Sequence, residues 1–248
     1  MSKTAHYDEL ASEFESKWDF GPEYRPWVVR RVVDTLQLTS TSSLLDVGGG
    51  TGNFTAAIAA LAQAPLQQCT VLEPSAGMAG VAAKRGLPTV VKGAFEYAVG
   101  VEKESLPFTQ SLFKEVVHHL DLAATFQALF DAAPSGHTAL VITRPQKVDF
   151  PFFQLALQAF ADSQPPLESI VAPIEAAGWA VETRTEAVPI TLATETWFAM
   201  LRARFMSSMA DISDAHIEAG IEELRSQHNG AETVSFHDNL LFIIARKA

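Results

Sequence analysis

The sequence contains one cysteine, few basic residues and no long apolar run. Because Cys69 is the single thiol among 248 residues, the chain can form no internal disulfide. Cys69 lies in the apolar segment Cys-Thr-Val-Leu, which predicts a buried strand residue. The first residues lack the apolar core of a secretory signal, and the apolar stretch 240–245 is far too short to span a bilayer. We therefore expect a cytoplasmic protein with no membrane partner.

Positive charge is also scarce. Lys and Arg total 18 against 29 Asp and Glu, which gives a net charge of −11, and no basic run interrupts the sequence. A nucleic-acid partner requires a concentrated positive surface, so we expect none. Hydrophobic residues make up 48% of the chain, which is enough for a substantial core. The length suits one α/β domain over residues 1–248.

Short apolar segments alternate with helical patterns in the first part of the chain. We expect strands at 43–47, 69–73, 89–92, within 108–117 and at 139–143, separated by helices at 53–62, 76–84 and 121–132. This alternation predicts a parallel sheet with helices on both faces. Further on, we expect helices at 152–161 and 167–177, a strand at 181–192, and a last strand at 234–245 whose pattern is interrupted at 237–239.

The remaining segments are expected to cover this core. Residues 1–38 have the apolar spacing of a helical N-terminal cover. The core itself would comprise residues 40–192 and 231–248. Residues 193–230 would then be an insertion before the last strand, with two helices that divide near 211–214. Such an insertion is well placed to act as a lid over the carboxyl edge of the sheet.

A glycine-rich segment, Asp46-Val-Gly-Gly-Gly-Thr-Gly, follows the first expected strand and opens a helix. Glycines at this point allow a tight turn and a close approach of the backbone to a ligand. A dinucleotide fingerprint requires Gly-x-Gly-x-x-Gly. Counted from Gly48, its last position falls on Asn53, and the third glycine arrives one residue early, at Gly52.

Asp46, Gly48, Gly50 and Gly52 resemble the first motif of the class I S-adenosylmethionine-dependent methyltransferases, an acidic residue followed by Gly-x-Gly-x-Gly. The resemblance covers about residues 40–145 and points to no single member of the superfamily. It implies a Rossmann-like, seven-stranded and mostly parallel sheet whose last strand is antiparallel. It also implies that S-adenosylmethionine binds at the loop and leaves as S-adenosylhomocysteine, with Asp46 orienting the ammonium group.

The same resemblance assigns other contacts to the cofactor. Glu73, at the end of the second strand, would accept hydrogen bonds from both ribose hydroxyls. The remaining predicted cofactor contacts are Met78 near the adenosine, Ala94 and Phe95 at the adenine, Lys114 after the fourth strand, and Tyr7 in the N-terminal cover.

Methyl transfer is a direct displacement at a sulfonium methyl, so the protein chiefly aligns the reactants and excludes water. A general base is needed only for an acceptor that arrives protonated. His118 and His119 follow the fourth strand, and a histidine has a suitable pKa for that role. The two side chains cannot both point the same way. We favour His119 as the catalytic residue, because the family's more regular histidine falls there, with His118 as the second candidate.

The acceptor is expected to be a small molecule that bears a carboxylate or an aromatic ring. Arg144, after the fifth strand, and Arg202, on the lid helix that also carries Arg204, would bind a carboxylate through two hydrogen bonds. The aromatic residues expected to line the acceptor site are Trp18, Tyr24 and Trp197.

Several alternatives stay open at this stage. An NAD-dependent oxidoreductase and a cofactor-binding pseudoenzyme both compete with the methyltransferase interpretation. Metal-dependent members of the superfamily hold Mg²⁺ with carboxylates at the ends of the fourth and fifth strands. Lys114 and Arg144 stand there, so we expect no metal. The acceptor atom (N, O or S) and the choice between monomer and homodimer are left undecided.

Overall fold

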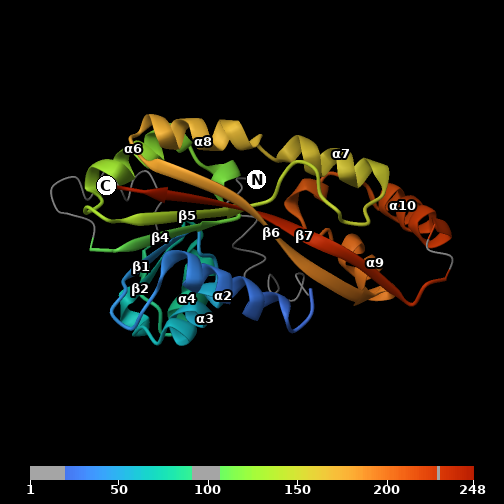
Figure 1. Cartoon of the computed structure of the whole chain (residues 1–248). Coiled ribbons are helices and arrows are strands. Elements are labelled where there is room, and N and C mark those ends of the chain that lie inside the picture. Colours follow the sequence, from blue (N-terminus) through green and yellow to red (C-terminus); the bar gives the residue numbers. More distant parts are fainter. Residues whose placement is uncertain (1–19, 91–106, 228–229) are drawn as a thin grey trace.

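The computed structural model describes residues 20–90, 107–227 and 230–248. At its centre is a seven-stranded sheet with the order β3-β2-β1-β4-β5-β7-β6 (Figure 1). The strands are β1 (Leu44–Val47), β2 (Cys69–Leu72), β3 (Thr89–Val90), β4 (Gln110–Lys114), β5 (Thr138–Thr143), β6 (Ala180–Ala193) and β7 (Thr233–Arg246). β7 is antiparallel to both of its neighbours, whereas β1 to β5 pair in parallel. The predicted Rossmann-like sheet with an antiparallel last strand is confirmed.

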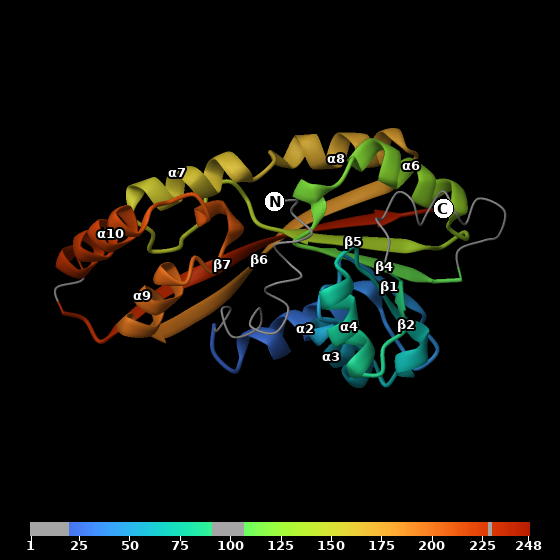
Figure 2. The ribbon, with the colours of Figure 1, turned by 180° about the vertical axis from the view of Figure 1, so that it is seen from behind.

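Helices cover both faces of this sheet, as Figures 1 and 2 show from opposite sides. On one face lie α2 (Tyr24–Leu36), α3 (Asn53–Ala62) and α4 (Ala76–Lys84); on the other lie α6 (Leu122–Ala132) and α8 (Leu167–Ala176). Consecutive residues of a strand point to opposite faces. Accordingly, Leu112 of β4 belongs to the apolar cluster beneath α2 and α3, and Phe113 belongs to the cluster beneath α6 and α8.

The β6–β7 hairpin extends well beyond the rest of the sheet (Figure 1). β5 ends where Thr143 pairs with Leu241, but β6 and β7 remain paired as far as Ala193 and Thr233. The extension carries α7 (Gln154–Ser163), α9 (Thr194–Arg202) and α10 (Asp214–Gln227). The last two helices lie between β6 and β7 in the chain, and the division into a core and a helical lid at 193–230 stays a prediction.

The last strand runs through residues 237–239, where polar side chains interrupt its apolar sequence pattern. β7 is continuous over 14 residues, and its inward-facing positions include Phe236, Asp238 and Leu240. Asp238 is fully buried in this apolar row. The polar residue therefore does not end the strand, because its partners lie inside the protein.

α10 and the segment before α7 approach each other at a glycine. A Cβ atom added to Gly220 would lie 2.2 Å from Cγ of Phe153, which is closer than real contacts allow. The Phe153 ring therefore lies directly over the α10 backbone, and a residue without a side chain is required there.

Cys69 in β2 and His137, directly before β5, are both buried titratable side chains. Cys69 is 2% exposed in β2, which confirms the predicted buried strand residue, and burial raises the pKa of its thiol to about 11. The His137 ring lies between the Ser111 hydroxyl at 2.9 Å and the Phe108 carbonyl at 3.0 Å. Burial lowers the pKa of His137 to about 4, so this histidine is neutral in the folded protein at pH 7.

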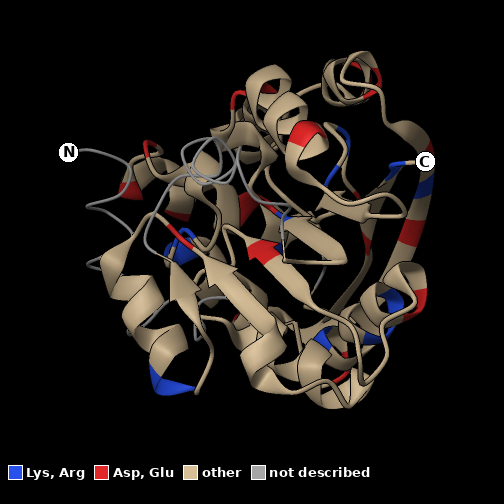
Figure 3. Cartoon of the chain, turned by 90° about the vertical axis from the view of Figure 1, so that its left-hand side faces the viewer, with Lys and Arg blue, Asp and Glu red and all other residues tan. Residues whose placement is uncertain are grey.

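Basic and acidic residues are interspersed in the view of Figure 3. No helix within the described ranges is long and apolar enough to cross a membrane.

Candidate functional site

The loop between β1 and α3 owes its Gly-x-Gly-x-Gly spacing to the backbone conformation. Gly48, Gly50 and Gly52 have φ angles of 67°, 57° and 72°, all in the left-handed region. Residues with a Cβ atom adopt this region at a cost of about 1–2 kcal/mol each. Three alternate left-handed residues therefore require three alternate glycines, which is the pattern that the sequence presents.

The space around these glycines differs from one to the next. A Cβ atom at Gly48 would lie 2.5 Å from Val116, and one at Gly52 would lie 2.5 Å from Leu87. At Gly49 it would lie 2.8 Å from the Asp46 carboxylate. At Gly50 it would meet no atom within 4 Å. The loop is thus closely packed against the protein except at Gly50, where the backbone faces open space.

Asp46 lies beneath the loop. It is 2% exposed, and its Oδ2 accepts a hydrogen bond of 2.5 Å from the Thr55 hydroxyl of α3. Burial raises the pKa of Asp46 to about 6, with a further contribution from Glu73; the Thr55 hydrogen bond and the Lys114 ammonium oppose this rise only in part. Asp46 therefore supports the loop from below and places a titratable carboxyl group against it.

Glu73 connects the end of β2 to the same loop. Its two carboxylate oxygens accept hydrogen bonds from the backbone N–H groups of Gly50, at 3.0 Å, and Ser75, at 2.9 Å. Met78 is 2% exposed in the first turn of α4, and its N–H group donates to the Ser75 hydroxyl. Glu73 thus stands beside the open position at Gly50, and the predicted ribose and adenosine contacts of Glu73 and Met78 stay predictions.

The loop lies at the topological switch point of the sheet. β1 is flanked by β2 on one side and β4 on the other, and ligands of open α/β sheets bind at the carboxyl ends of such a strand pair. At this point the Lys114 ammonium lies 4.3 Å from the centre of the Phe54 ring of α3. Burial lowers the pKa of Lys114 below its usual value. A cation therefore stands opposite the glycine loop.

A buried charge network adjoins Lys114 at the carboxyl ends of β4 and β5. Arg144 is 2% exposed and donates from Nε and Nη2 to the two carboxylate oxygens of Asp238, both at 2.7 Å. Nη1 of Arg144 lies 2.9 Å from Oε2 of Glu115. The Tyr24 hydroxyl donates to Asp238 at 2.8 Å and accepts from Nη2 of Arg144 at 3.2 Å. The four residues join α2, β7 and the segments that follow β4 and β5.

This network changes the expected role of Arg144. Burial disfavours the guanidinium charge, but the Asp238 and Glu115 carboxylates outweigh that effect and hold the pKa of Arg144 well above its usual value. Burial and the Asp238 carboxylate likewise raise the pKa of Tyr24. All three guanidinium nitrogens are engaged inside the protein, so Arg144 joins structural elements and offers no bidentate face to a substrate carboxylate.

The two histidines lie on a short 3-10 helix, η3 (Val117–His119), which follows β4 after two residues. Their ring centres are 4.0 Å apart; His118 is half-buried and His119 is exposed. Both rings therefore lie near the carboxyl end of β4, and the assignment of a base to either stays a prediction.

Trp197 lies in a different place from the one expected. Its side chain is completely buried, and Nε1 donates to the Pro151 carbonyl at 3.0 Å. Its ring stacks on Phe152, with centres 5.5 Å apart, and also contacts Phe236 of β7. Trp197 thus belongs to the aromatic core of the hairpin extension and not to a pocket wall.

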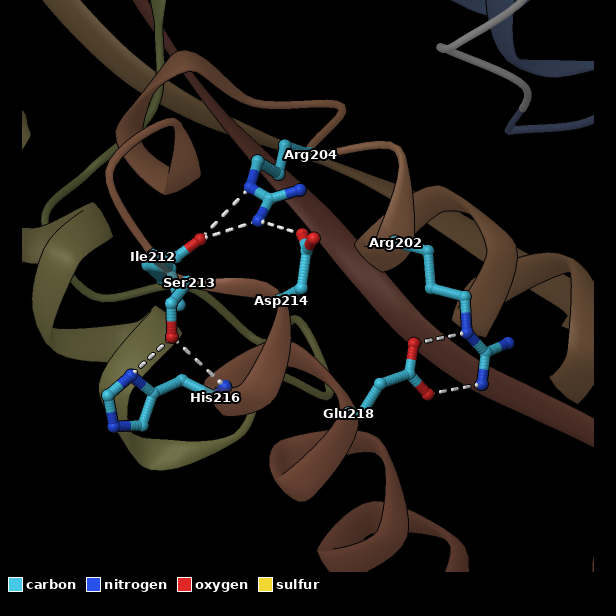
Figure 4. Close-up of polar contacts among 7 residues, drawn as sticks. All are labelled: Arg202, Arg204, Ile212, Ser213, Asp214, His216 and Glu218. Carbon is cyan, nitrogen blue, oxygen red and sulfur yellow. Dashed lines mark hydrogen bonds and ion pairs between the residues drawn. The ribbon is translucent and has the colours of Figure 1, made fainter.

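Arg202 and Arg204, at and just after the end of α9, form surface ion pairs (Figure 4). Arg202 of α9 donates to both carboxylate oxygens of Glu218 in α10, at 2.8 and 2.9 Å. Arg204 donates to the Ile212 carbonyl and to Asp214. These arginines tie α9 and the turn that follows it to α10, so the expected substrate contact of Arg202 is replaced by a link between helices.

Four predicted site residues, Tyr7, Trp18, Ala94 and Phe95, lie outside the described residues. Within the described ranges, no group of three His, Cys, Asp or Glu side chains is arranged to hold a metal ion. Two members of the charge network, Glu115 and Asp238, were not among the predicted site residues. The available signal for Asp238 was its inward-facing position between Phe236 and Leu240.

The structure resembles solved structures of the same architecture. A phosphoethanolamine N-methyltransferase of Haemonchus contortus, solved with S-adenosylhomocysteine, matches 87% of this chain and 51% of its own, with 18% identity and a TM-score of 0.53. The chain thus spans about half the length of that protein. A protein of Anabaena variabilis, named as a methyltransferase of an antibiotic biosynthesis pathway, matches 88% of this chain and 96% of its own, with 19% identity and a TM-score of 0.58.

The same architecture also carries other chemistry. The [4+2]-cyclase SpnF matches 89% of this chain and 80% of its own, with 14% identity and a TM-score of 0.56. No protein-family model and no curated protein sequence matches the chain. At these identities the likeness concerns the fold, and the described part of the chain has the fold of the class I S-adenosylmethionine-dependent methyltransferases.

Proposed function

We propose that this protein transfers a methyl group from S-adenosylmethionine to a small-molecule acceptor. The loop at 46–52 carries the proposal: three left-handed glycines at the switch point, open space at Gly50, and the Glu73 carboxylate beside that opening. The solved methyltransferases that share this fold support the same donor.

The described residues fit such a donor. It supplies a methyl group on a positively charged sulfur whose leaving group is a neutral thioether. The open space at Gly50 allows close approach, while Glu73 would accept hydrogen bonds from ribose hydroxyls. The Asp46 carboxyl group beneath the loop and the Lys114 ammonium opposite it would orient the charged ends of the amino-acid portion. The protein's main contribution is then to hold the reactants in line and to exclude water.

The reaction needs no metal in this proposal. Lys114 is the last residue of β4 and Arg144 directly follows β5, and their positive charges disfavour a cation between them. The acceptor would enter on the side where η3 places His118 and His119, and either ring could take a proton from an acceptor N, O or S atom. We place this reaction in the cytoplasm, with a monomer or homodimer as the working form.

Two other activities would use the same loop. An NAD-dependent oxidoreductase would need the dinucleotide spacing, which Gly52 and Asn53 do not provide. The second alternative is a protein that binds the methyl donor without transferring its methyl group. We include it in the test because the cyclase SpnF is similar to this chain in fold.

The test combines binding and turnover. Thermal unfolding would be measured with S-adenosylhomocysteine and with NAD, and the binding constants by calorimetry. Methyl release from labelled S-adenosylmethionine would then be followed over a panel of amines, alcohols, thiols and carboxylic acids. We expect stabilisation by S-adenosylhomocysteine and methyl release to at least one class. Stabilisation by NAD alone would contradict the proposal, and binding without transfer to any class would favour the non-methylating alternative.

A further inference from the structure

Glu115 has an unusual backbone conformation at the carboxyl end of β4. It directly follows β4, and its φ angle is 56°, in the region that favours glycine. Its N–H group donates to the Ile142 carbonyl of β5 at 2.8 Å, which fixes the turn. A left-handed residue with a side chain is strained by about 1–2 kcal/mol, and such residues cluster at functional sites.

The Glu115 carboxylate is satisfied at only one of its two oxygens. Oε2 pairs with Arg144 at 2.9 Å, whereas Oε1 is buried and has no hydrogen-bond partner among the described residues. A buried acceptor without a partner costs about 1–3 kcal/mol. The fold therefore maintains both a strained backbone and an unpaired oxygen at one residue.

The carboxylate is held firmly in this position. Arg144 contacts Glu115 through Nη1, and its other two nitrogens are bound to Asp238 and the Tyr24 hydroxyl. Rotation of the Glu115 carboxylate toward another partner would break the contact with a buried guanidinium. Arg144, Asp238 and Tyr24 are thus positioning residues that fix where Oε1 lies.

Both chain neighbours of Glu115 contact the region of the proposed donor site. Val116 lies against Gly48 of the glycine loop, and Lys114 contacts Phe54 at the start of α3. A fixed carboxylate oxygen at this point attracts a group that donates a hydrogen bond and repels a carboxylate. We infer that Oε1 of Glu115 receives the N–H or O–H group of the methyl acceptor, and that the acceptor is therefore an amine or an alcohol.

This inference rests on the proposed methyl transfer. As the lone pair of the acceptor nitrogen or oxygen forms its bond to the methyl carbon, the methyl–sulfur bond breaks and its electron pair stays on sulfur. The acceptor atom gains a positive charge and passes its proton to Oε1, so the carboxylate becomes a carboxylic acid. Glu115 then returns the proton to solvent, and no other reactant is needed.

The test uses three probes that share one ring: benzylamine, benzyl alcohol and benzoate. Their binding to the full chain saturated with S-adenosylhomocysteine would be measured by ligand-observed NMR. We expect the wild-type protein to bind benzylamine and benzyl alcohol at least about tenfold more tightly than benzoate. The Glu115→Gln variant should lose at least about tenfold in benzylamine affinity and keep its affinity for S-adenosylhomocysteine within about twofold.

Glu218→Gln is the matched control, because it removes another carboxylate paired with an arginine, on the surface of α10. It should bind all probes as the wild type does. Equal binding of benzoate and benzylamine to the wild type, no benzylamine binding, or unchanged benzylamine affinity in Glu115→Gln would each overturn the inference. The comparison of benzylamine with benzoate binding to the wild type tests the inference even if the variant does not fold. A protein that fails to bind S-adenosylhomocysteine would instead contradict the proposed function.

Discussion

Replacement of Gly50 by alanine separates the role of the loop in folding from its role in binding. Gly50 has a φ angle of 57°, and an added methyl group would meet no protein atom within 4 Å. The methyl group would project into the space where we place the methyl donor. Gly50→Ala should therefore be mildly destabilising but strongly impaired in binding.

The magnitude follows from the backbone and the surroundings. Alanine in the left-handed region costs about 1–2 kcal/mol, which corresponds to a fall in Tm of about 2–8 °C for a chain of this size. Gly136 has a φ angle of 79° and equally open surroundings, but it lies in the turn before β5, where no ligand is expected. Gly136→Ala is therefore a matched control with the same strain. Gly52→Ala adds overlap with Leu87 at 2.5 Å, and overpacking raises its cost to about 2–5 kcal/mol.

Urea unfolding of the four proteins and calorimetry with S-adenosylhomocysteine provide the measurements. Gly50→Ala and Gly136→Ala should be destabilised equally, but only Gly50→Ala should lose about tenfold or more in affinity. Gly52→Ala should be the least stable. Wild-type affinity in Gly50→Ala would refute the placement of the donor over this residue, and equal stability of Gly50→Ala and Gly52→Ala would refute the packing argument.

Three further predictions concern stability. Gly220→Ala in α10 should destabilise the protein by about 1–3 kcal/mol in urea unfolding, because its methyl group would overlap a phenylalanine ring 2.2 Å away. Gly80→Ala is the control: it lies in α4 with open surroundings, so it should raise the free energy of unfolding by up to about 1 kcal/mol. Cys69, with its pKa raised to about 11, should resist thiol reagents at pH 8 until the protein unfolds, and labelling of the native protein at the rate of the unfolded chain would contradict its burial. The pKa of Asp46 is about 6 in the folded protein and 3.8 in the unfolded chain, so its contribution to stability falls as the pH rises from about 4 to 6. The pKa of His137 is about 4 in the folded protein and 6.5 in the unfolded chain, so its contribution to stability increases as the pH rises from about 4 to 6.5. Each of these two contributions to the free energy of unfolding amounts to roughly 3 kcal/mol, so in the wild type they nearly cancel. In Asp46→Asn only the His137 contribution remains, so the variant should gain roughly 3 kcal/mol of stability as the pH rises from about 4 to 6.5. A flat pH profile in the variant would disprove the assignment.

The regular part of the fold could be predicted because its signals are local. The expected helices at 53–62 and 76–84 coincide with α3 and α4, and the strands of the parallel sheet fall within a few residues of their expected positions. Each element is specified by apolar spacing within its own sequence and by the glycines or prolines that end it. The glycine loop is equally local, since three alternate left-handed residues leave a readable pattern in seven consecutive positions.

The acceptor side of the site could not be predicted in the same way. Tyr24, Arg144 and Asp238 are far apart in the sequence and come together only because β7 inserts between β5 and β6. Without the knowledge that Asp238 is buried beside it, Arg144 has the features of an anion-binding residue. Likewise, Arg202 and Trp197 have the sequence features of pocket residues. In the structure, Arg202 instead pairs with Glu218 on the surface, and Trp197 is buried in the aromatic core of the hairpin extension.

The turn at Glu115 explains why the side chains of two adjacent charged residues lie on the same side of the sheet. In a continuing strand Lys114 would follow Leu112 toward α2 and α3, while Glu115 would follow Phe113 toward α6 and α8. The left-handed conformation at Glu115 ends this alternation, so Lys114 reaches Phe54 of α3 while Glu115 pairs with Arg144, which is itself bound to Tyr24 of α2. A cation and an anion thus lie on one face at the end of one strand. Glycine at position 115 would relieve the strain but remove the carboxylate, so the strained glutamate is consistent with a role for its side chain at the acceptor site.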